Sequence, residues 1–269
     1  MKLNEETFQE FVSKESILNA SDNQITVVGP ISTASKLKRV NLSKNILKTD
    51  ESLIGLAKME NLTWLSLAQN SITSFSLIFP RLQVLNLSNN KLKKLPSNLH
   101  SFTSLKALIL NNNDIESVSG VALPTSLDTL VLSHNKIQLI DMDFSNCKSL
   151  DKLSLSHNNI KEIEHLPQSL CELRLSHNQL CSLPDDLLLK KLNFLDLGSN
   201  NFSSIHELES LKRSKGLKGL ILKGNSLDYS SFVSDWFPRL RHLDNKVVKS
   251  LIAEANIVDK ANKDNKRNN

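Results

Sequence analysis

One short motif recurs nine times in this chain of 269 residues, and it constrains the fold more than any other feature of the sequence. Leu62, Leu65, Leu67 and Asn70 form one copy of the pattern LxxLxLxxN. The asparagines that end the nine copies, at intervals of 20 to 25 residues, are Asn45, Asn70, Asn90, Asn113, Asn135, Asn158, Asn178, Asn200 and Asn225. Repetition at this period predicts a stack of similar coils, because one coil alone cannot bury its apolar residues.

The last two leucines of each motif are separated by one residue, which is the period of a β-strand. Their side chains therefore point to the same side of the strand, and we expect this side to be buried. Stacked coils would place these strands about 4.8 Å apart in a parallel sheet. The sequence thus predicts an α/β fold, a curved right-handed solenoid of nine to ten repeats. Its concave face would be the sheet, and its convex face would mix helical, 3-10 and extended segments.

Asparagine and leucine are both unusually frequent in this chain, with 29 and 49 residues respectively. A side-chain amide both donates and accepts hydrogen bonds, whereas a carboxylate only accepts them at neutral pH. An asparagine at the turn after each strand can therefore satisfy backbone groups of its own coil and of the neighbouring coil. We expect the motif asparagines to form a buried ladder that supports the fold and takes no part in function.

This arrangement resembles the leucine-rich repeat proteins, and the resemblance covers roughly residues 15–248. Repeat length varies, and we expect the backs of the coils to vary with it. The Leu95-Pro96 segment lies in a 23-residue repeat of the common LPxxL form. The Phe79-Pro80 and Leu166-Pro167 segments lie in 20-residue repeats, which predicts extended backs. Apolar residues three apart from Ile205 onward predict a short helix there.

The repeats occupy residues 31–227, and the ends of such a solenoid need caps because they would otherwise expose apolar side chains. Residues 1–30 are predicted to contain a cap helix and a degenerate first repeat that ends at Asn23. The helix is expected within residues 4–18, with Asn4 as its N-cap and an apolar stripe of Phe8, Phe11, Val12 and Leu18. Its alternative role is to bind a partner, although such a stripe most often packs on its own domain.

A second cap is predicted over residues 228–257. Its Tyr229, Trp236-Phe237-Pro238 and Leu243-Asp244 resemble the C-terminal cap of intracellular leucine-rich repeat families. Those families are the U2 snRNP A-prime proteins, the mRNA export factors, the acidic nuclear phosphoproteins and the phosphatase-1 regulatory proteins. A short helix is expected to pack on the cap, around Val247, Val248, Leu251 and Ile252. The polar, basic residues 258–269 are predicted to be disordered.

The N-terminal residues and the cysteines predict the compartment of the protein. The first residues lack the apolar core of a signal peptide, and the sequence contains no apolar stretch long enough to span a membrane. Cys147, Cys171 and Cys181 are odd in number and form no CxxC motif. They favour free thiols in the cytoplasm or the nucleus, and the resemblance of the C-terminal cap strengthens that prediction.

The concave face is where we expect a partner protein to bind, through the third, fifth and seventh motif positions. A predicted apolar stripe over four neighbouring strands consists of Trp64, Val84, Ile109 and Val131. Exposed tryptophan is enriched at binding hot spots. A predicted second anchor with charged neighbours consists of Phe194, Lys152, Glu172, Arg174 and Asp196. The alternative is that these apolar side chains only pack against one another or against an ordered terminus.

Three Ser-His-Asn triplets place His134, His157 and His177 at one edge of the predicted sheet. A zinc site or a pH sensor is conceivable there, but no cysteine or carboxylate shares that motif position. Adjacent serine and histidine point apart and lack an orienting acid, so they do not form a catalytic triad. The sequence also lacks the common nucleotide and metalloprotease motifs. We therefore expect no catalytic site, cofactor or metal.

The basic residues concentrate near the C-terminus. Residues 212–249 contain nine lysines and arginines against three aspartates, a balance of +6 in a chain of net charge +5. A possible basic patch consists of Lys212, Arg213, Lys215, Lys218, Arg239 and Arg241. Such a patch could attract RNA or an acidic partner, but there is little aromatic interleaving for base stacking.

Together these patterns predict a monomeric, non-enzymatic scaffold that binds a partner protein on its concave face. One alternative is an adaptor associated with RNA processing or with a ribonucleoprotein, because of the basic segment and the nuclear families with similar caps. A second alternative is a regulatory subunit of protein phosphatase 1, against which the irregular repeat lengths count. The fold alone does not distinguish among these three functions.

Overall fold

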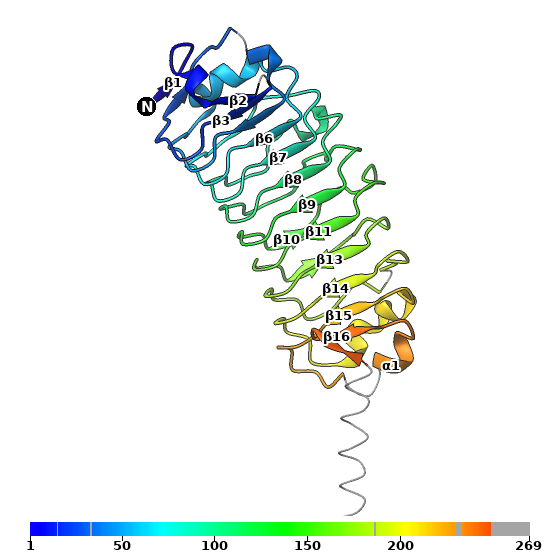
Figure 1. The fold of residues 1–269 in the computed structure, drawn as a ribbon. Coiled ribbons are helices and arrows are strands. Elements are labelled where there is room, and N and C mark those ends of the chain that lie inside the picture. The colour runs from blue at the N-terminus through cyan, green and yellow to red at the C-terminus, as the bar shows by residue number, and fades with distance from the viewer. Residues whose placement is uncertain (15, 33, 186, 230–232, 249–269) are drawn as a thin grey trace, which may run out of the picture.

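The chain folds into an elongated solenoid in which each repeat makes one coil and adds one strand to a continuous sheet (Figure 1). The computed structural model describes residues 1–14, 16–32, 34–185, 187–229 and 233–248. Strands of successive coils pair in parallel, as in Trp64 with Val84 and Val84 with Ala107. The leucine-rich repeat solenoid that the sequence predicts is therefore confirmed.

The main sheet has thirteen strands in the described residues, and its central part is entirely parallel. Its strands are β2 (Val12–Lys14), β3 (Ile17–Asn19), β5 (Arg39–Asn41), β6 (Trp64–Ser66), β7 (Val84–Asn86), β8 (Ala107–Ile109), β9 (Thr129–Val131), β11 (Lys152–Ser154), β13 (Glu172–Arg174), β14 (Phe194–Asp196), β15 (Gly219–Ile221), β16 (His242–Leu243) and β17 (Lys246–Val247). Two short parallel pairs lie outside it, β1 (Lys2–Leu3) with β4 (Val27–Val28) and β10 (Leu139–Ile140) with β12 (Glu162–Ile163).

Aligned leucines explain why these short strands are stable. Leu65, Leu85 and Leu108 are in register on neighbouring strands, and all three are fully buried. The same holds along the sheet, so the leucines form one apolar column inside the solenoid. Each strand of three residues is too short to be stable alone, and it depends on the coils on either side.

The motif asparagines form the predicted ladder. The Nδ2 group of Asn113 donates to the carbonyls of Leu110 in its own coil and Leu87 in the preceding coil, both at 3.0 Å. Its Oδ1 accepts from the amide of Leu92, also at 3.0 Å. The other eight asparagines bond their own and the preceding coil in the same way. Aspartate could make only the accepting bond, which explains why asparagine fills this position.

The backs of the coils vary as the repeat lengths predict. The expected short helix is the 3-10 helix η5 (Ile205–Arg213), which begins with a capping box between Ser204 and Glu207. The other 3-10 helices are η1 (Phe8–Phe11), η2 (Ala34–Lys36), η3 (Asp50–Lys58) and η4 (Leu99–Ser101). The 20-residue repeats have the extended backs that were expected, and β12 lies in one of them.

The N-terminal cap differs from the prediction, because residues 4–18 do not form an amphipathic helix. Asn4 begins a turn by accepting the amides of Glu6 and Thr7 at 3.2 Å, but the turn continues only as η1. The chain then forms the antiparallel strands β2 and β3, so Leu18 lies in the sheet. This hairpin pairs with the first parallel strand, and the edge of the sheet gains backbone hydrogen bonds that a helix could not supply.

In its described residues the C-terminal cap contains one helical turn, α1 (Val233–Trp236), followed by the hairpin of β16 and β17. Asp244 directly follows β16, and its Oδ1 accepts the amides of Leu222 and Lys223 in the preceding coil at 2.8 and 2.9 Å. Burial and the hydrogen bond to Asp244 raise the pKa of Tyr229 to about 12. Val247 lies in β17, whereas Leu251, Ile252 and the tail 258–269 lie outside the described residues.

Candidate functional site

The strand register fixes how the predicted apolar stripe lies on the sheet. Trp64 and Val84 are directly opposite each other at the third motif position, whereas Ile109 and Val131 are opposite each other at the fifth. Val84 is in register with Ala107, so the stripe moves two residues along the strands between β7 and β8. All four side chains of the stripe are half-buried. The stripe therefore consists of the pair Trp64 and Val84 and the pair Ile109 and Val131, which lie diagonally to each other on the sheet.

Trp64 is covered on one side by an arginine that the sequence analysis did not assign to the site. Arg39 is directly opposite Trp64 on β5, and its guanidinium carbon lies 5.1 Å from the centre of the indole ring. A cation at this distance from an aromatic face is attracted by the ring. Arg39 takes part in none of the ion pairs found among the described residues. We call Arg39, Trp64 and Val84 the Trp64 cluster.

Phe194 also lies beneath an arginine, but its surroundings are more occupied. The guanidinium carbon of Arg174 is 4.9 Å from the ring centre, and Arg174 Nε donates to Glu172 Oε1 at 2.6 Å. On the other side the ring covers Gly219, where an added Cβ would lie 2.7 Å from Phe194 Cδ2. We call Glu172, Arg174, Phe194 and Gly219 the Phe194 cluster. The structure thus brings three of the predicted charged and aromatic residues into contact.

The other two charged candidates have different surroundings. Lys152 is exposed on β11, directly opposite Glu172 and Thr129. Asp196 is buried, and its Oδ1 accepts the amide of Gly198 at 3.0 Å. Lys152 therefore remains accessible on the face, whereas Asp196 supports the turn after its own strand.

The three histidines form a stack along the edge of the sheet, here called the histidine ladder. The ring centres of His134 and His157 are 4.1 Å apart, and the same distance separates His157 from His177. Each residue has a φ of 55° to 56°, because the position before the motif asparagine is left-handed. Partial desolvation, followed by the charges of His134 and His177, lowers the pKa of His157, while Asp196 acts in the opposite sense. No metal-binding cluster of histidine, cysteine or acidic residues was found in the described ranges.

Three of the six residues of the predicted basic patch contact other parts of the chain, two of them at Trp236 in the C-terminal cap. Lys212 Nζ lies 4.6 Å from the ring centre of Trp236 and 3.0 Å from Glu209. Lys215 donates to the Trp236 carbonyl at 3.1 Å, and Arg213 donates to the Asp185 carbonyl at 2.9 Å. The remaining members, Lys218, Arg239 and Arg241, are exposed.

Comparisons with protein families detect leucine-rich repeats in the middle of the chain. A model described as leucine rich repeat matches residues 103–160, a two-copy leucine rich repeat model matches residues 80–123, and a further leucine rich repeat model matches residues 149–173. These matches support the repeats that the sequence predicts. They do not extend to the C-terminal cap, so its resemblance to nuclear families stays a prediction.

Several characterised proteins are similar to this chain. Toll-like receptor 6 of Bos taurus is 29% identical over 40% of this chain and 14% of the receptor. The transforming growth factor beta activator LRRC33 of Danio rerio is 30% identical over 67% of this chain and 29% of the activator. The structure of the plant peptide hormone receptor RGFR1 in complex with RGF2 has a TM-score of 0.63 at 26% identity, over 79% of this chain and 36% of the receptor.

The chain thus spans less than a third of the length of these two curated relatives. A search of the described residues found no helix that is long and apolar enough to cross a membrane. The relatives do not support the predicted intracellular location.

Proposed function

We propose that this leucine-rich repeat chain is a non-enzymatic scaffold that binds a partner protein on its sheet face, with the Trp64 cluster as the main contact. Leucine-rich repeat solenoids present an extended surface that is suited to protein binding. The structure of RGFR1 in complex with RGF2 is an example of a similar chain bound to a partner. We also propose that the chain is a monomer.

The observation that carries this proposal is the environment of Trp64. The indole is half-buried, it is in register with Val84, and it is held by an exposed arginine without an ion pair among the described residues. Tryptophan and arginine are among the residues enriched at binding hot spots. A partner could cover the indole and offer a carboxylate to Arg39 in one contact.

Affinity capture of the full chain from cells that express it naturally tests this function, with quantitative mass spectrometry as the measurement. Trp64→Ala should reduce recovery of the main partner about thirtyfold, which corresponds to the loss of a hot spot of about 2 kcal/mol. Gln83→Ala is the matched control, because this exposed residue directly precedes Val84 and β7. Equal recovery by folded wild-type and Trp64→Ala proteins would exclude the Trp64 cluster as the binding site.

The same experiment separates the two alternatives. Nuclease treatment should leave the partner bound, whereas an adaptor for RNA would lose its ribonucleoprotein partners. Contacts of Lys212 and Lys215 with Trp236, and of Arg213 with the Asp185 carbonyl, leave less free charge for RNA than the sequence suggested. Recovery of a protein phosphatase 1 catalytic subunit would favour the regulatory alternative.

The intracellular location stays part of this proposal. Its support is that Cys147, Cys171 and Cys181 are all free thiols, as expected in a reducing compartment. The Toll-like receptor and the growth factor activator among the relatives count against it. Fluorescence microscopy of the tagged full chain distinguishes a cytoplasmic or nuclear location from a secreted one.

A further inference from the structure

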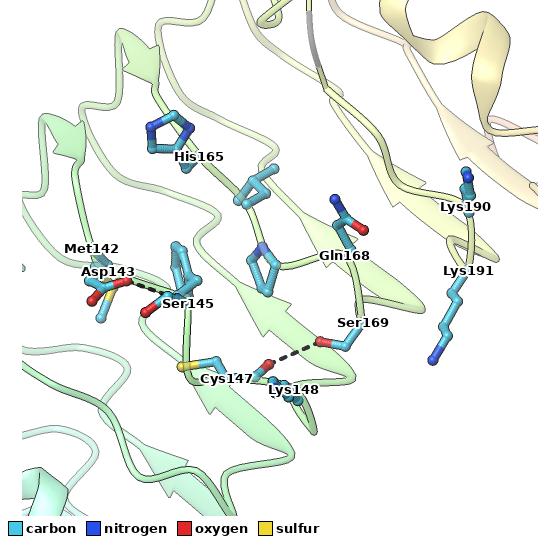
Figure 2. A pocket seen from close by; sticks show the side chains of 13 residues that line it. Met142, Asp143, Ser145, Cys147, Lys148, His165, Gln168, Ser169, Lys190 and Lys191 are labelled. Carbon is cyan, nitrogen blue, oxygen red and sulfur yellow. Dashed lines mark hydrogen bonds between the residues drawn. The ribbon is translucent and has the colours of Figure 1, made fainter.

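The backs of three successive coils border a hollow of about 680 Å³, shown in Figure 2. It is lined by the connecting segments 142–148, 165–169 and 190–191. The middle repeat has 20 residues between its asparagines, against 23 and 22 in the repeats on either side. Its shorter back leaves space between the two neighbours. We call this space the basic hollow, because of the side chains at its edge.

The floor of the basic hollow is apolar. Phe144, Cys147 and Pro167 are buried, and Leu166 is half-buried. Burial raises the pKa of the Cys147 thiol to about 11, so this side chain is neutral and behaves as a small apolar group. The floor can therefore accept an apolar side chain without displacing a charge.

Hydrogen bonds within and between the coils fix the shape of the basic hollow. The Cys147 amide donates to the Phe144 carbonyl at 2.9 Å. The Ser169 hydroxyl reaches across to the preceding coil, where it donates to the carbonyl of Leu150 at 2.6 Å and lies 3.2 Å from that of Cys147 (Figure 2). A binding site of fixed shape needs less ordering when a ligand binds.

The edge of the basic hollow carries an excess of positive charge. Lys148, Lys190 and Lys191 border it, and none of them takes part in the ion pairs found among the described residues. Asp143 is the only carboxylate among the lining residues, and hydrogen bonds from the hydroxyl and amide of Ser145 lower its pKa. In Figure 2 the two lysines of the third coil lie on the side opposite Asp143.

We propose that the basic hollow binds an acidic segment of a partner protein in an extended conformation. One apolar side chain would enter between Phe144 and Leu166, and flanking carboxylates would pair with the lysines. Neighbouring coils are about 4.8 Å apart, so Lys148 and Lys190 belong to coils separated by roughly 10 Å. That distance equals about three residues of extended chain. Alternating side chains of a strand can point an apolar group inward and acidic groups outward.

A small anion or the chain's own C-terminus would fit this site less well. A small anion would not contact the apolar floor, and it could pair with the lysines of only one coil. Residues 249–269 contain five lysines and arginines against three acidic residues, so their charge has the same sign as the edge. Charge complementarity therefore favours an acidic protein segment from another molecule. This inference does not depend on the proposed contact at Trp64.

Fluorescence polarisation with a labelled Asp-Glu-Phe-Glu-Asp peptide and the full chain tests the proposal. Lys148→Gln, Lys190→Gln and Lys191→Gln together should weaken binding about tenfold, the effect expected for three surface ion pairs. The matched control replaces Lys91, Lys93 and Lys94 with glutamine, because these exposed lysines lie outside the hollow. The control has the same net charge and should bind within twofold of the wild type.

Two further probes separate the apolar contact from the charge. Asp-Glu-Ala-Glu-Asp should bind several-fold more weakly than the phenylalanine peptide, and the weakening should persist at high salt. Equal weakening by both lysine triples, or no measurable binding of the first peptide to the wild type, would overturn the proposal. Displacement of the probe by a peptide of residues 249–269 at equal affinity would assign the hollow to this chain itself.

Discussion

The Trp64 and Phe194 clusters occupy the same motif position, yet their aromatic rings are held differently. In both, an arginine lies about 5 Å above the ring. Arg174 is held by Glu172, and the Phe194 ring fills the space left by Gly219 on the next strand. Arg39 has no carboxylate partner among the described ion pairs, and Trp64 is opposite a valine.

An aromatic residue on the sheet face is therefore weak evidence for binding by itself. The Phe194 ring covers the sheet at Gly219, where there is no side chain, and Glu172 already neutralises Arg174. Trp64 covers no glycine on the strand that follows it, and Arg39 can still pair with a carboxylate of a partner. Partner binding should therefore depend more on the Trp64 cluster, and stability should depend more on the Phe194 cluster.

The largest expected effect is on stability when each ring is removed. Phe194→Ala should lower the free energy of unfolding by about 2 kcal/mol, which is less than the roughly 3–5 kcal/mol for a fully buried phenylalanine. Trp64→Ala should cost about half as much, since Val84 and Arg39 still cover the strands there. Urea unfolding followed by circular dichroism measures both. Equal losses would show that the two clusters do not differ in structural role.

A methyl group at Gly219 tests whether Phe194 fills the missing side chain. Gly219→Ala should destabilise the protein by about 1–2 kcal/mol, because the new Cβ would lie 2.7 Å from the ring. The same change in a Phe194→Ala background should be neutral or stabilising. The double-mutant cycle from urea unfolding gives the coupling. Additive effects would mean that the ring moves aside without cost.

Glu172→Gln makes the Phe194 cluster more like the Trp64 cluster, by removing the carboxylate that holds Arg174. The expected loss of stability is small, about 0.5 kcal/mol, since the arginine side chain is 48% exposed and such pairs are screened by water. The loss should shrink further in 1 M salt. Thermal unfolding at low and high salt checks this, and a loss that does not depend on salt would contradict an ion-pair origin.

The smallest effect on stability is expected at the histidine ladder, which lies in the repeats between the two clusters. The pKa of folded His157 is lowered below its usual 6.5, so the unfolded chain binds more protons below that pH. The free energy of unfolding should therefore fall as the pH is lowered through 6.5, and level off below the folded pKa. His157→Asn should reduce this slope, and Asn89 and Asn112 already occupy the same left-handed position in other repeats. An unchanged slope from pH 7.5 to 5 would contradict a role for His157.

Local pattern was sufficient to predict the solenoid, the asparagine ladder and the side chains that point out from the sheet. The reason is that each of these depends on residues within one coil, repeated in register. The pattern failed at the N-terminus, where Phe8, Phe11, Val12 and Leu18 fit a helix as well as a hairpin. Pairing with β5 decided that choice, and such an edge contact has no local signal in the sequence.

The repeated motif is therefore sufficient to specify a leucine-rich repeat stack with its variable residues on one sheet. Which of those residues are free depends on contacts that no single repeat contains. Contacts between coils place Arg39 over Trp64, Phe194 over Gly219 and Ser169 against the preceding coil. These contacts join residues about 20 to 25 positions apart, so their geometry depends on how coils of unequal length stack. The basic hollow likewise depends on this stacking, because residues of three successive coils line it.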